Sequence, residues 1–349
     1  MKNTLKVIFS QVLILLFVLT MFTGCFKKDS SQDPQTDDYS SNDSSTGYIN
    51  PLTGLDIEKD KVNLRPVCVM TNNMKKAQPL HGVSDADILF ECLIEGGITR
   101  IMQVHKDIAS APTLGTVRSA RPYFINLAHG LGAIYVHLGG SFQAYDILKS
   151  GYINSIDLIT NGNYMWRDAA RRKNLGLEHS AFTSGEKLVQ AINKKGYNTQ
   201  IDNNYKFKMN FSNDSPVLSG KDATKLIAKF SGYKSTVFDY DEKNQTYLVS
   251  QFDKPQMDGN KNIQNSKPNV IILRAETSQV PKTELLSINL IGSGEGYYMS
   301  HGKIIEINWK RNNDNELFTY STKDGKDVPR LKGQTYVCVM TKTAPVTFS

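Results

Sequence analysis

The residues of this chain that can do chemistry are concentrated between residues 91 and 180. Three apolar segments there end in charged or polar residues, and an arginine-rich polar segment follows them. Polar residues at the ends of buried segments commonly converge on one edge of an α/β core, where ligands bind. We therefore predict a binding site whose candidate residues are Glu91, Glu95, Arg100, Arg118, Ser119, Arg121, His137, Gly139, Gly140, Ser141, Arg167, Asp168, Arg171 and His179.

Arg118 and Arg121 are the most specific pair in this set. They lie three positions apart where a second helix is expected to open, within residues 116–122. Pro122 suits the first turn of that helix, and Ser119 is a candidate cap. The free N–H groups of a helix start favour an anion, and two guanidiniums fit a phosphate or a carboxylate. The alternative is a scaffold in which both arginines form salt bridges to Glu91 or Glu95.

Glu91 and Glu95 are expected on a helix over residues 85–96, with Ser84 as its cap and two glycines after its end. Four positions apart on a helix, the two carboxylates share a face. Paired carboxylates favour acid/base chemistry or a metal. Bonding to a lysine or an arginine on the helix surface is the competing interpretation.

Gly139, Gly140 and Ser141 follow an expected strand over residues 133–138 and precede an expected helix over 141–150. Glycines at this position let the backbone approach a ligand closely. The pattern is neither G-x-G-x-x-G nor a P-loop, and Ser141 has no G-x-S-x-G context. His137, inside the strand, is either a satisfied core histidine or a base.

The elements that position these residues predict an α+β fold in two domains. The first, residues 51–202, is an α/β-like mixed sheet with helices, and further strands are expected at 65–71 and 99–106 and a helix at 184–194. The second, residues 203–349, begins with a linker and is mostly antiparallel β, with hairpin turns such as His301-Gly302 and one helix over 219–231.

The N-terminus predicts a lipid anchor. Residues 1–24 read as a secretory signal, and a cysteine directly after small residues is the bacterial lipoprotein variant, with Cys25 as the lipidated residue. Residues 25–50 form a polar tether. We expect the chain to contact the lipid bilayer through Cys25 on the extracytoplasmic face of the cell membrane. An uncleaved transmembrane anchor is the alternative.

The composition narrows the class of partner. The chain carries 41 Lys+Arg against 34 Asp+Glu, a net charge of +7, which suits anionic neighbours at a cell wall, although a soluble face rich in lysine explains it equally well. Nucleic acid is not expected in that compartment. Cys68, Cys92 and Cys338 lie in apolar runs and are expected to be buried free thiols. No metal site and no cofactor is predicted.

The runs RPVCVMTNN, SDADILFECLIEGGITR, GTVRSARPYF, AIYVHLGGS and RDAARRKNLGLEHS resemble the YerB-like lipoproteins of Gram-positive bacteria, and the resemblance extends from about Pro51 to the end. It implies a membrane-tethered envelope protein of two domains, both of unassigned function, and no established reaction. The candidate site residues match positions of that family. There are three departures. Glu178-His179-Ser180 stands where the family usually has Pro-His-Asn, Asn72-Asn73 where it often has an acidic residue, and Cys92 where it usually has alanine.

Two functions of different classes follow. The first is a non-enzymatic binding or regulatory module that recognises an anionic envelope polymer, such as a wall precursor, teichoic acid or peptidoglycan, or an envelope protein. The second is an envelope hydrolase or transferase acting on phosphate- or carboxylate-bearing glycopolymers. There, Glu91 or Asp168 would be the base, His137 or His179 the acid, and the arginines would stabilise negative charge. The first is favoured because arginines are many and nucleophiles few.

Overall fold

The structure, a computed structural model, describes residues 47–202, 205 and 209–349 of the 349-residue chain. The predicted signal peptide, the lipidation site Cys25 and most of the predicted tether lie outside the described residues. Residues 45–349 form one compact unit. Within the described part of the chain, no helix is long and apolar enough to cross a membrane.

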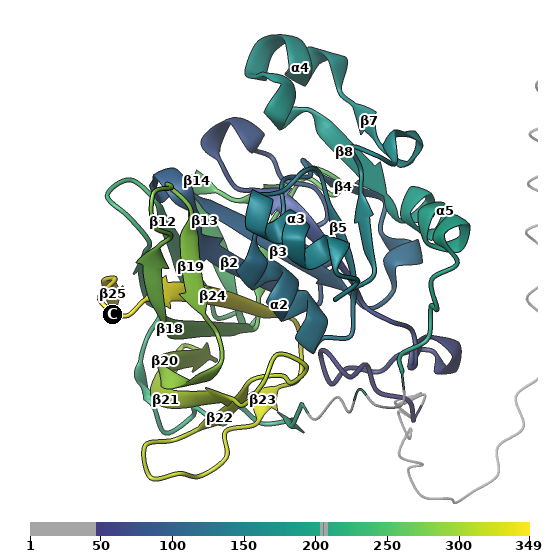
Figure 1. Ribbon diagram of the computed structural model, residues 1–349. Coiled ribbons are helices and arrows are strands. Elements are labelled where there is room, and N and C mark those ends of the chain that lie inside the picture. The colour runs from purple at the N-terminus through teal and green to yellow at the C-terminus, as the bar shows by residue number, and fades with distance from the viewer. Residues whose placement is uncertain (1–46, 203–204, 206–208) are drawn as a thin grey trace, which may run out of the picture. The chain divides into compact units, whose positions relative to one another are not determined.

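A twelve-stranded mixed sheet runs through this unit and takes strands from both halves of the chain (Figure 1). Its main path is β10 (Lys221–Asp222), β21 (Lys303–Arg311), β20 (Gly292–Ser300), β18 (Asn269–Gln279), β24 (Thr335–Thr341), β2 (Ile88–Leu93), β3 (Thr99–His105), β1 (Val67–Asn72), β5 (Ile134–His137) and β6 (Ser155–Asp157). Two further strands pair off this path, β19 (Leu286–Asn289) with β18 and β22 (Thr319–Ser321) with β21.

The strand directions bring many strand ends to one edge of this sheet. β1, β5 and β6 are parallel to one another, and β2, β24 and β18 are parallel to one another. β3 lies antiparallel between β1 and β2, so both parallel groups run the same way. Their C-terminal ends therefore meet the start of β3 at a common edge, which we call the carboxyl edge.

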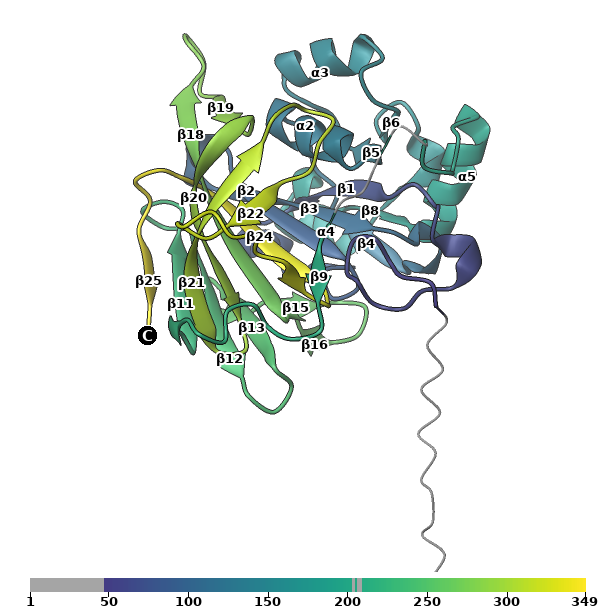
Figure 2. The ribbon, with the colours of Figure 1, turned by 90° about the horizontal axis from the view of Figure 1, so that it is seen from below.

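One face of the sheet is covered by α2 (Pro122–Gly130) and α3 (Phe142–Lys149), as Figures 1 and 2 show. Phe124 and Leu127 of α2 and Ala144 of α3 are buried in a core with Met70 and Met102 of the sheet. Burial of these apolar side chains, at about 25 cal/mol per Å², holds the helices in place. We call this the α2 face.

The opposite face is covered by two smaller sheets and a helix. The first sheet contains β14 (Lys254–Pro255), β13 (Thr246–Gln251), β12 (Ser235–Asp241), β11 (Lys225–Lys229), β25 (Val346–Phe348) and β17 (Ser266–Lys267). The second contains β4 (Thr113–Gly115), β8 (Ala181–Ser184) and β7 (Trp166–Arg167), and α5 (Gly185–Lys195) packs beside it. Separate apolar clusters fill the two interfaces with the main sheet.

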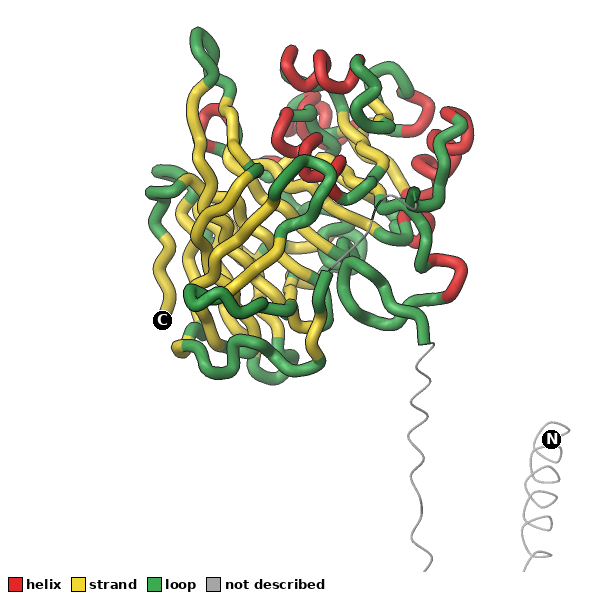
Figure 3. Tube along the Cα trace, turned by 60° about the horizontal axis from the view of Figure 1, so that its bottom comes forward, coloured by secondary structure: helices red, strands yellow, loops and turns green. Residues whose placement is uncertain are grey.

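The remaining elements are short. They are α4 (Ala169–Leu175), the strand pairs β15 (Met257–Asp258) with β16 (Ile263–Gln264) and β9 (Phe211–Ser212) with β23 (Arg330–Leu331), and the 3-10 segments η1 (Lys59–Lys61), η2 (Lys75–Ala77), η3 (Glu95–Gly97), η4 (Ile108–Ser110), η5 (Gly162–Tyr164) and η6 (Leu177–His179). The α-helices described all lie before residue 196, and Figure 3 shows them gathered beside the strands of the first half.

The α+β fold class is confirmed, and many of the expected elements are present. The strands expected at 65–71, 99–106 and 133–138 are β1, β3 and β5. The helix expected at 184–194 is α5: Ser184 accepts a hydrogen bond from the Lys187 amide, and Gly196 ends the helix with a φ of 65°. These segments carry signals that are decided locally, by caps and by apolar periodicity.

The prediction of a helix over residues 85–96 is wrong, because residues 88–93 form the strand β2. Ile88, Phe90 and Cys92 face the core below α2, while Leu89 lies in the core of the opposite face. A strand buried on both faces is apolar throughout and does not alternate cleanly. Hydrogen bonds from β3 on one side and β24 on the other complete this strand, and both partners are decided by tertiary structure.

Two further expectations are corrected. The helix over residues 219–231 is wrong, because that segment contains β10 and β11, and β11 has the alternating burial of a strand packed on one face. Ser119 does not cap α2. Arg121 occupies the N-cap position there without a capping side-chain bond, and Pro122 starts the helix as expected.

Candidate functional site

Three arginines meet at the carboxyl edge. Arg100, in β3, lies opposite Asn72, the last residue of β1. Arg118 is held between strands, because its amide donates to the Met70 carbonyl and its carbonyl accepts from the Leu138 amide. A hydrogen bond from Ala120 N to the Gly139 carbonyl fixes the same loop just before Arg121. We call Arg100, Arg118, Arg121 and the nearby Glu95 the arginine cluster.

Glu95 is the acid within this cluster. The Arg121 guanidinium donates from Nε to Glu95 Oε2 at 3.0 Å and from Nη2 to Oε1. Arg100 Nη2 lies 3.8 Å from Glu95 Oε1. Burial raises the pKa of Glu95, but the hydrogen bonds and charge of Arg121 outweigh this and lower it overall. The salt bridge between Arg121 and Glu95 is one of the structural salt bridges that the sequence offered as the alternative to a binding site.

Arg118 differs from its neighbours. Arg100 also donates to the Ser119 carbonyl, and Arg121 to the Ala120 carbonyl, each at 2.8 Å. The Arg118 side chain has no hydrogen-bond partner among the described residues, and its Nε is buried. The Nε of Arg100 is likewise buried without a partner. Burial, then the charges of Arg121 and Arg118, lower the pKa of Arg100 to about 9. Burial lowers the pKa of Arg118, and the charge of Glu178 raises it more than that of Glu95 does. The three guanidiniums thus share two carboxylates, and one positive charge is left over.

His179 and Asn72 adjoin the cluster. The Asn72 amide nitrogen lies 2.9 Å from His179 Nδ1, and His179 Nε2 lies 3.4 Å from a Glu178 carboxylate oxygen. Burial lowers the pKa of His179, Glu178 raises it, and the charge of Arg118 lowers it. The structure therefore places His179 in contact with Asn72 and within range of the Arg118 charge. The contribution of Asn72 was not expected from its sequence context, which only indicated a strand end.

The glycine-rich loop after β5 supports the cluster. His137 is buried, with Nδ1 2.8 Å from the Gly139 carbonyl and with Nε2 unpartnered. Burial lowers its pKa. The Gly139 amide donates to Asp157, and Ser141 caps α3 by accepting from the Ala144 amide. Gly139 has a φ of 76°, which favours glycine. The backbone of this loop is hydrogen-bonded to that of Ala120, and the His137 and Ser141 side chains bond residues of the loop itself and of α3.

Arg167, Asp168 and Arg171 have other partners. Asp168 caps α4 by accepting from the Arg171 amide at 2.7 Å. Arg171 donates to three consecutive carbonyls, those of residues 77–79, and its guanidinium lies over the Phe182 ring. Arg167 donates to the Leu177 carbonyl and to Ser180 Oγ. These three residues hold the loop that carries His179.

Glu91 points away from the arginines. It lies in β2 next to Cys92, and Cys92 is the residue that pairs with Arg100, so Glu91 projects from the other face of the sheet. The expected helical face shared with Glu95 does not exist. Glu91 is fully buried, and we call the following set the Glu91 network: Glu91, Asn73, Thr99, Lys234, Thr236, Gln251 and Tyr336.

The Glu91 network joins the two halves of the chain. Thr99 Oγ1 donates to Glu91 at 2.6 Å, and the hydroxyls of Thr236 and Tyr336 each donate at 2.8 Å. Lys234 Nζ lies 3.3 Å from Glu91, and only 1% of that side chain is exposed. Burial lowers the pKa of Lys234, and the Glu91 charge opposes this. The partners from the second half carried no signal in their local sequence.

The described residues contain no group of three or more His, Cys, Asp or Glu side chains placed to hold a metal ion. Cys68, Cys92 and Cys338 are free and buried, which confirms the prediction of buried thiols. Burial raises the pKa of all three, and the Glu91 charge adds to the rise for Cys92 and Cys338. A raised pKa suppresses the reactive thiolate.

Comparison with known proteins identifies the family. Residues 52–198 match the model described as "Protein of unknown function (DUF3048) N-terminal domain", and residues 226–337 match the corresponding C-terminal domain. The chain is 30% identical over 332 residues to "Putative lipoprotein YerB" of Bacillus subtilis strain 168, covering 94% of each chain. The chain belongs to the YerB (DUF3048) family.

A crystal structure of YerB from Bacillus subtilis has the same fold. It superposes with a TM-score of 0.75 at 28% identity, covering 86% of this chain and 99% of the crystallised one. The resemblance drawn from the sequence motifs is therefore confirmed. The family descriptions assign no activity to either domain.

Proposed function

We propose that this YerB-family chain is a lipid-anchored protein of the cell envelope that binds an anionic group through the arginine cluster. The observation that carries the proposal is the Arg118 side chain, which has no hydrogen-bond partner among the described residues and has two other guanidiniums nearby. A partly buried guanidinium without a partner is costly for the free protein, and a bound anion would offset that cost.

The anchoring part of the proposal rests on the N-terminal sequence and on the relative. Cys25 follows an apolar segment and small residues, and the Bacillus subtilis relative is named as a lipoprotein. Lipidation of Cys25 would hold the chain on the extracytoplasmic face of the membrane. The ligand would then be an envelope component, such as a wall polymer, a wall precursor or an envelope protein.

The chemistry of the cluster favours a phosphate or carboxylate group. Arg121 already binds the Glu95 carboxylate through two of its nitrogens, which is the arrangement in which a guanidinium binds a carboxylate or a phosphate group. The Arg118 guanidinium makes no hydrogen bond to a described residue, so an incoming anion can bind it while Arg121 and Arg100 keep Glu95.

The positions of the acids support binding over the alternative of an envelope hydrolase or transferase. Both bases of that alternative have structural roles: Glu91 is enclosed on the opposite face of the sheet, and Asp168 caps α4. His137 bonds a backbone carbonyl from within the core. His179 is the one acid candidate beside the arginines.

The test is a calorimetric titration of the full chain in detergent micelles. The probes are inorganic phosphate, pyrophosphate, a teichoic acid fragment and a muropeptide. We expect at least one to bind, and Arg118→Ala to weaken it about tenfold or more, since a hydrogen bond to a charged group contributes about 1.5–3 kcal/mol. The melting temperature should change little, because the Arg118 side chain has no partner to lose.

Arg172→Ala is the matched control, because Arg172 is an exposed arginine on α4. It removes the same charge and should leave the affinity unchanged at constant ionic strength. Equal affinities of the wild type and Arg118→Ala would overturn the proposal. So would the failure of all four probes to bind the wild-type chain.

A further inference from the structure

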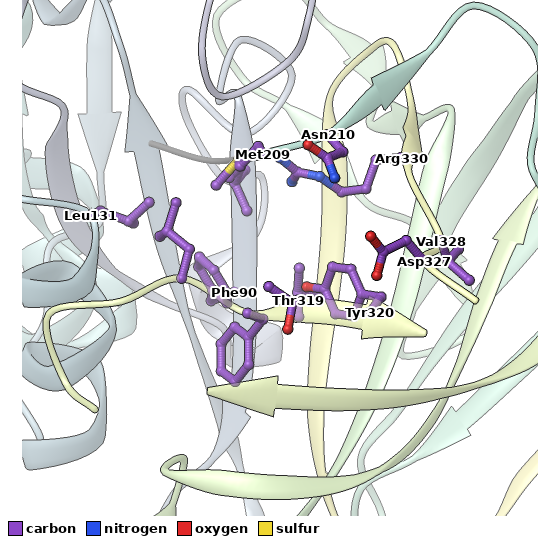
Figure 4. A pocket seen from close by; sticks show the side chains of 13 residues that line it. Phe90, Leu131, Met209, Asn210, Thr319, Tyr320, Asp327, Val328 and Arg330 are labelled. Atoms are coloured by element: carbon purple, nitrogen blue, oxygen red, sulfur yellow. Dashed lines mark hydrogen bonds between the residues drawn. The ribbon is translucent and has the colours of Figure 1, made fainter. Parts of the chain in front are cut away.

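A second polar site lies away from the arginine cluster, in a cavity of about 80 Å³. Phe90 of β2 and Leu131, which directly follows α2, are among the apolar residues that line it, and the second half contributes Asn210, β22 and the segment leading into β23. Figure 4 shows Arg330 and Asn210 on one side of the cavity and Thr319 and Tyr320 on another, with the Asp327 carboxylate beside Tyr320.

Arg330 is the unusual residue of this cavity. It is only 5% exposed, yet no carboxylate among the described residues pairs with it. Its Nη2 donates to the Leu52 carbonyl at 3.4 Å and contacts the Met209 sulfur, and its guanidinium lies 4.8 Å from the Phe211 ring centre. Burial lowers its pKa. A buried cation without a counter-ion is costly to the fold unless an anion is bound there.

Asp327 supplies a carboxylate to the same cavity. It is an exposed residue, and no ion pair joins it to Arg330 within 4.0 Å or to any other described residue. A simple anion at Arg330 would meet this second negative charge. A ligand that carries both charges would satisfy the two side chains at once. Opposite charges that line one cavity without pairing are thus complementary to a zwitterion.

We propose that this cavity binds a small zwitterionic α-amino acid. The carboxylate of the ligand pairs with Arg330, and its ammonium group pairs with Asp327. Asn210, Thr319 and Tyr320 add polar groups beside the two charges, while Phe90, Val328 and Val337 form an apolar wall. An apolar lining with a few convergent polar groups is the usual composition of a small-molecule site.

The volume restricts the ligand. On this measure of volume one water needs about 10–15 Å³, so a cavity of about 80 Å³ holds about five to eight waters or a molecule with a similar number of non-hydrogen atoms. Glycine and alanine match that size. Phenylalanine, with about twice as many non-hydrogen atoms, exceeds it. The site is therefore selective for small side chains.

The proposal is independent of the anion site. The cavity is lined by none of the residues of the arginine cluster. Its occupant carries no net charge, so the net positive charge of the chain does not explain binding. Arg118→Ala should accordingly leave amino-acid affinity unchanged, and Asp327→Asn should leave anion affinity unchanged.

The test is a calorimetric titration of the full chain in detergent micelles with alanine and glycine. Propionate, ethylammonium and phenylalanine are the comparison probes, since they lack the ammonium group, the carboxylate or the small size. We expect alanine and glycine to bind, and each comparison probe to bind about tenfold more weakly or worse, because a charge-assisted hydrogen bond is lost or the ligand does not fit.

Two variants decide the result. Arg330→Gln should abolish alanine binding, although it also removes contacts that hold Leu52 and Met209. Asp327→Asn changes an exposed side chain and should weaken alanine binding about tenfold, whereas propionate binding should become no weaker, because the opposing negative charge is removed. Asp324→Asn is its matched control, since Asp324 lies exposed in the neighbouring turn and outside the cavity. Alanine that fails to bind, or that binds Asp327→Asn as tightly as the wild type, overturns the proposal.

Discussion

Two polar clusters lie on opposite faces of the same pair of strands, and they differ in the balance of their charges. On the face toward β12 and β13, the Glu91 carboxylate accepts hydrogen bonds from Asn73, Thr99 and Tyr336, among others. On the α2 face, three guanidiniums share the Glu95 and Glu178 carboxylates, and one positive charge is left over.

The difference separates a scaffold from a binding site. In the Glu91 network one carboxylate faces one ammonium group inside the core, although Asn73 Oδ1, Gln251 Oε1 and Lys234 Nζ lack hydrogen-bond partners among the described residues. Such a buried, charge-balanced network contributes specificity to the fold. The arginine cluster carries more cations than carboxylates, and an anionic ligand would offset the cost of that excess. The sequence analysis predicted that Glu91 and Glu95 share one face of a helix. In the structure Glu91 belongs to the buried network on one face of the sheet, and Glu95 pairs with arginines on the other.

The largest effect should come from the Glu91 network. Glu91→Gln leaves the Lys234 ammonium buried without its counter-ion, and breaking one side of a buried ion pair costs about 3–5 kcal/mol. Urea denaturation should therefore show a much lower free energy of unfolding. The affinity of the remaining folded protein for an anion should be unchanged, since Glu91 lies on the other face.

Glu276→Gln provides the control for this change. Glu276 lies 3.5 Å from Lys342 with both side chains exposed, and such a surface pair contributes little. The double variant Glu91→Gln with Lys234→Met should recover part of the lost stability, because the stranded charge is then removed. A Glu91→Gln variant as stable as Glu276→Gln would show that the network is not the scaffold we describe.

A smaller and opposite pair of effects is expected at Glu95. Glu95→Gln removes the counter-charge of Arg121 and Arg100, and we expect a loss of about 1–3 kcal/mol in the free energy of unfolding. The same change should tighten phosphate or pyrophosphate binding, because an incoming anion no longer competes with the carboxylate. Denaturation and calorimetric titration of one preparation give both quantities.

Glu186→Gln is the reference variant, since Glu186 is exposed on α5 and its carboxylate bonds Gln190. It should change neither the stability nor the affinity. Weaker anion binding in Glu95→Gln would mean that Glu95 orients the arginines for the ligand, and the picture of a cluster with spare positive charge would then be wrong.

The smallest effect concerns pH. Burial lowers the pKa of His179 below its ordinary value of 6.5, Glu178 raises it and Arg118 lowers it. Below pH 6.5 the unfolded chain binds this proton more readily than the folded chain does, so stability falls as the pH falls through this range. Arg118→Ala should raise the pKa of His179 and reduce that loss, as an NMR titration and denaturation at pH 5 and 7 would show.

His137 serves as the internal reference in this titration. Burial lowers the pKa of His137, whereas the charge of Asp157 and the hydrogen bond with the Gly139 carbonyl raise it. Arg118 does not influence this pKa. The His137 signal should therefore titrate alike in both proteins. A His179 pKa that stays the same after Arg118→Ala would place the Arg118 charge out of range of His179, and the cluster would be smaller than described.

The fold was predictable where the signal is local. Ser184 and Gly196 mark both ends of α5, and the apolar run before His137 marks β5. Residues 85–96 carry equally good capping signals, yet they form a strand because β24 hydrogen-bonds one side of it. That partner is more than 240 residues away, as the pairing of Leu89 with Tyr336 shows, and no local pattern reports it.

The site was predictable in composition and only partly in geometry. The convergence of Arg100, Arg118 and His179 was expected from charged residues at strand ends, and the charge of Arg118 acts on the pKa of both Arg100 and His179. Glu91 was misplaced because the wrong element gave it the wrong periodicity. Lys234 and Tyr336 were missed altogether, because a buried lysine and a buried tyrosine look like ordinary surface and core residues in sequence.

The position of β24 also sets the order in which the molecule can be assembled. It is the last strand of the main sheet along the chain, yet it lies in the interior of that sheet, between β18 and β2. Until β24 is in place, β2 and β18 present unpaired edges, which are prone to pairing with other chains. In a chain that emerges N-terminus first, the strands on the β2 side and those on the β18 side of the main sheet therefore stay unconnected until residue 341 has been synthesised. Truncations upstream of Thr335 should accumulate as aggregates or be degraded, with no folded first half left behind.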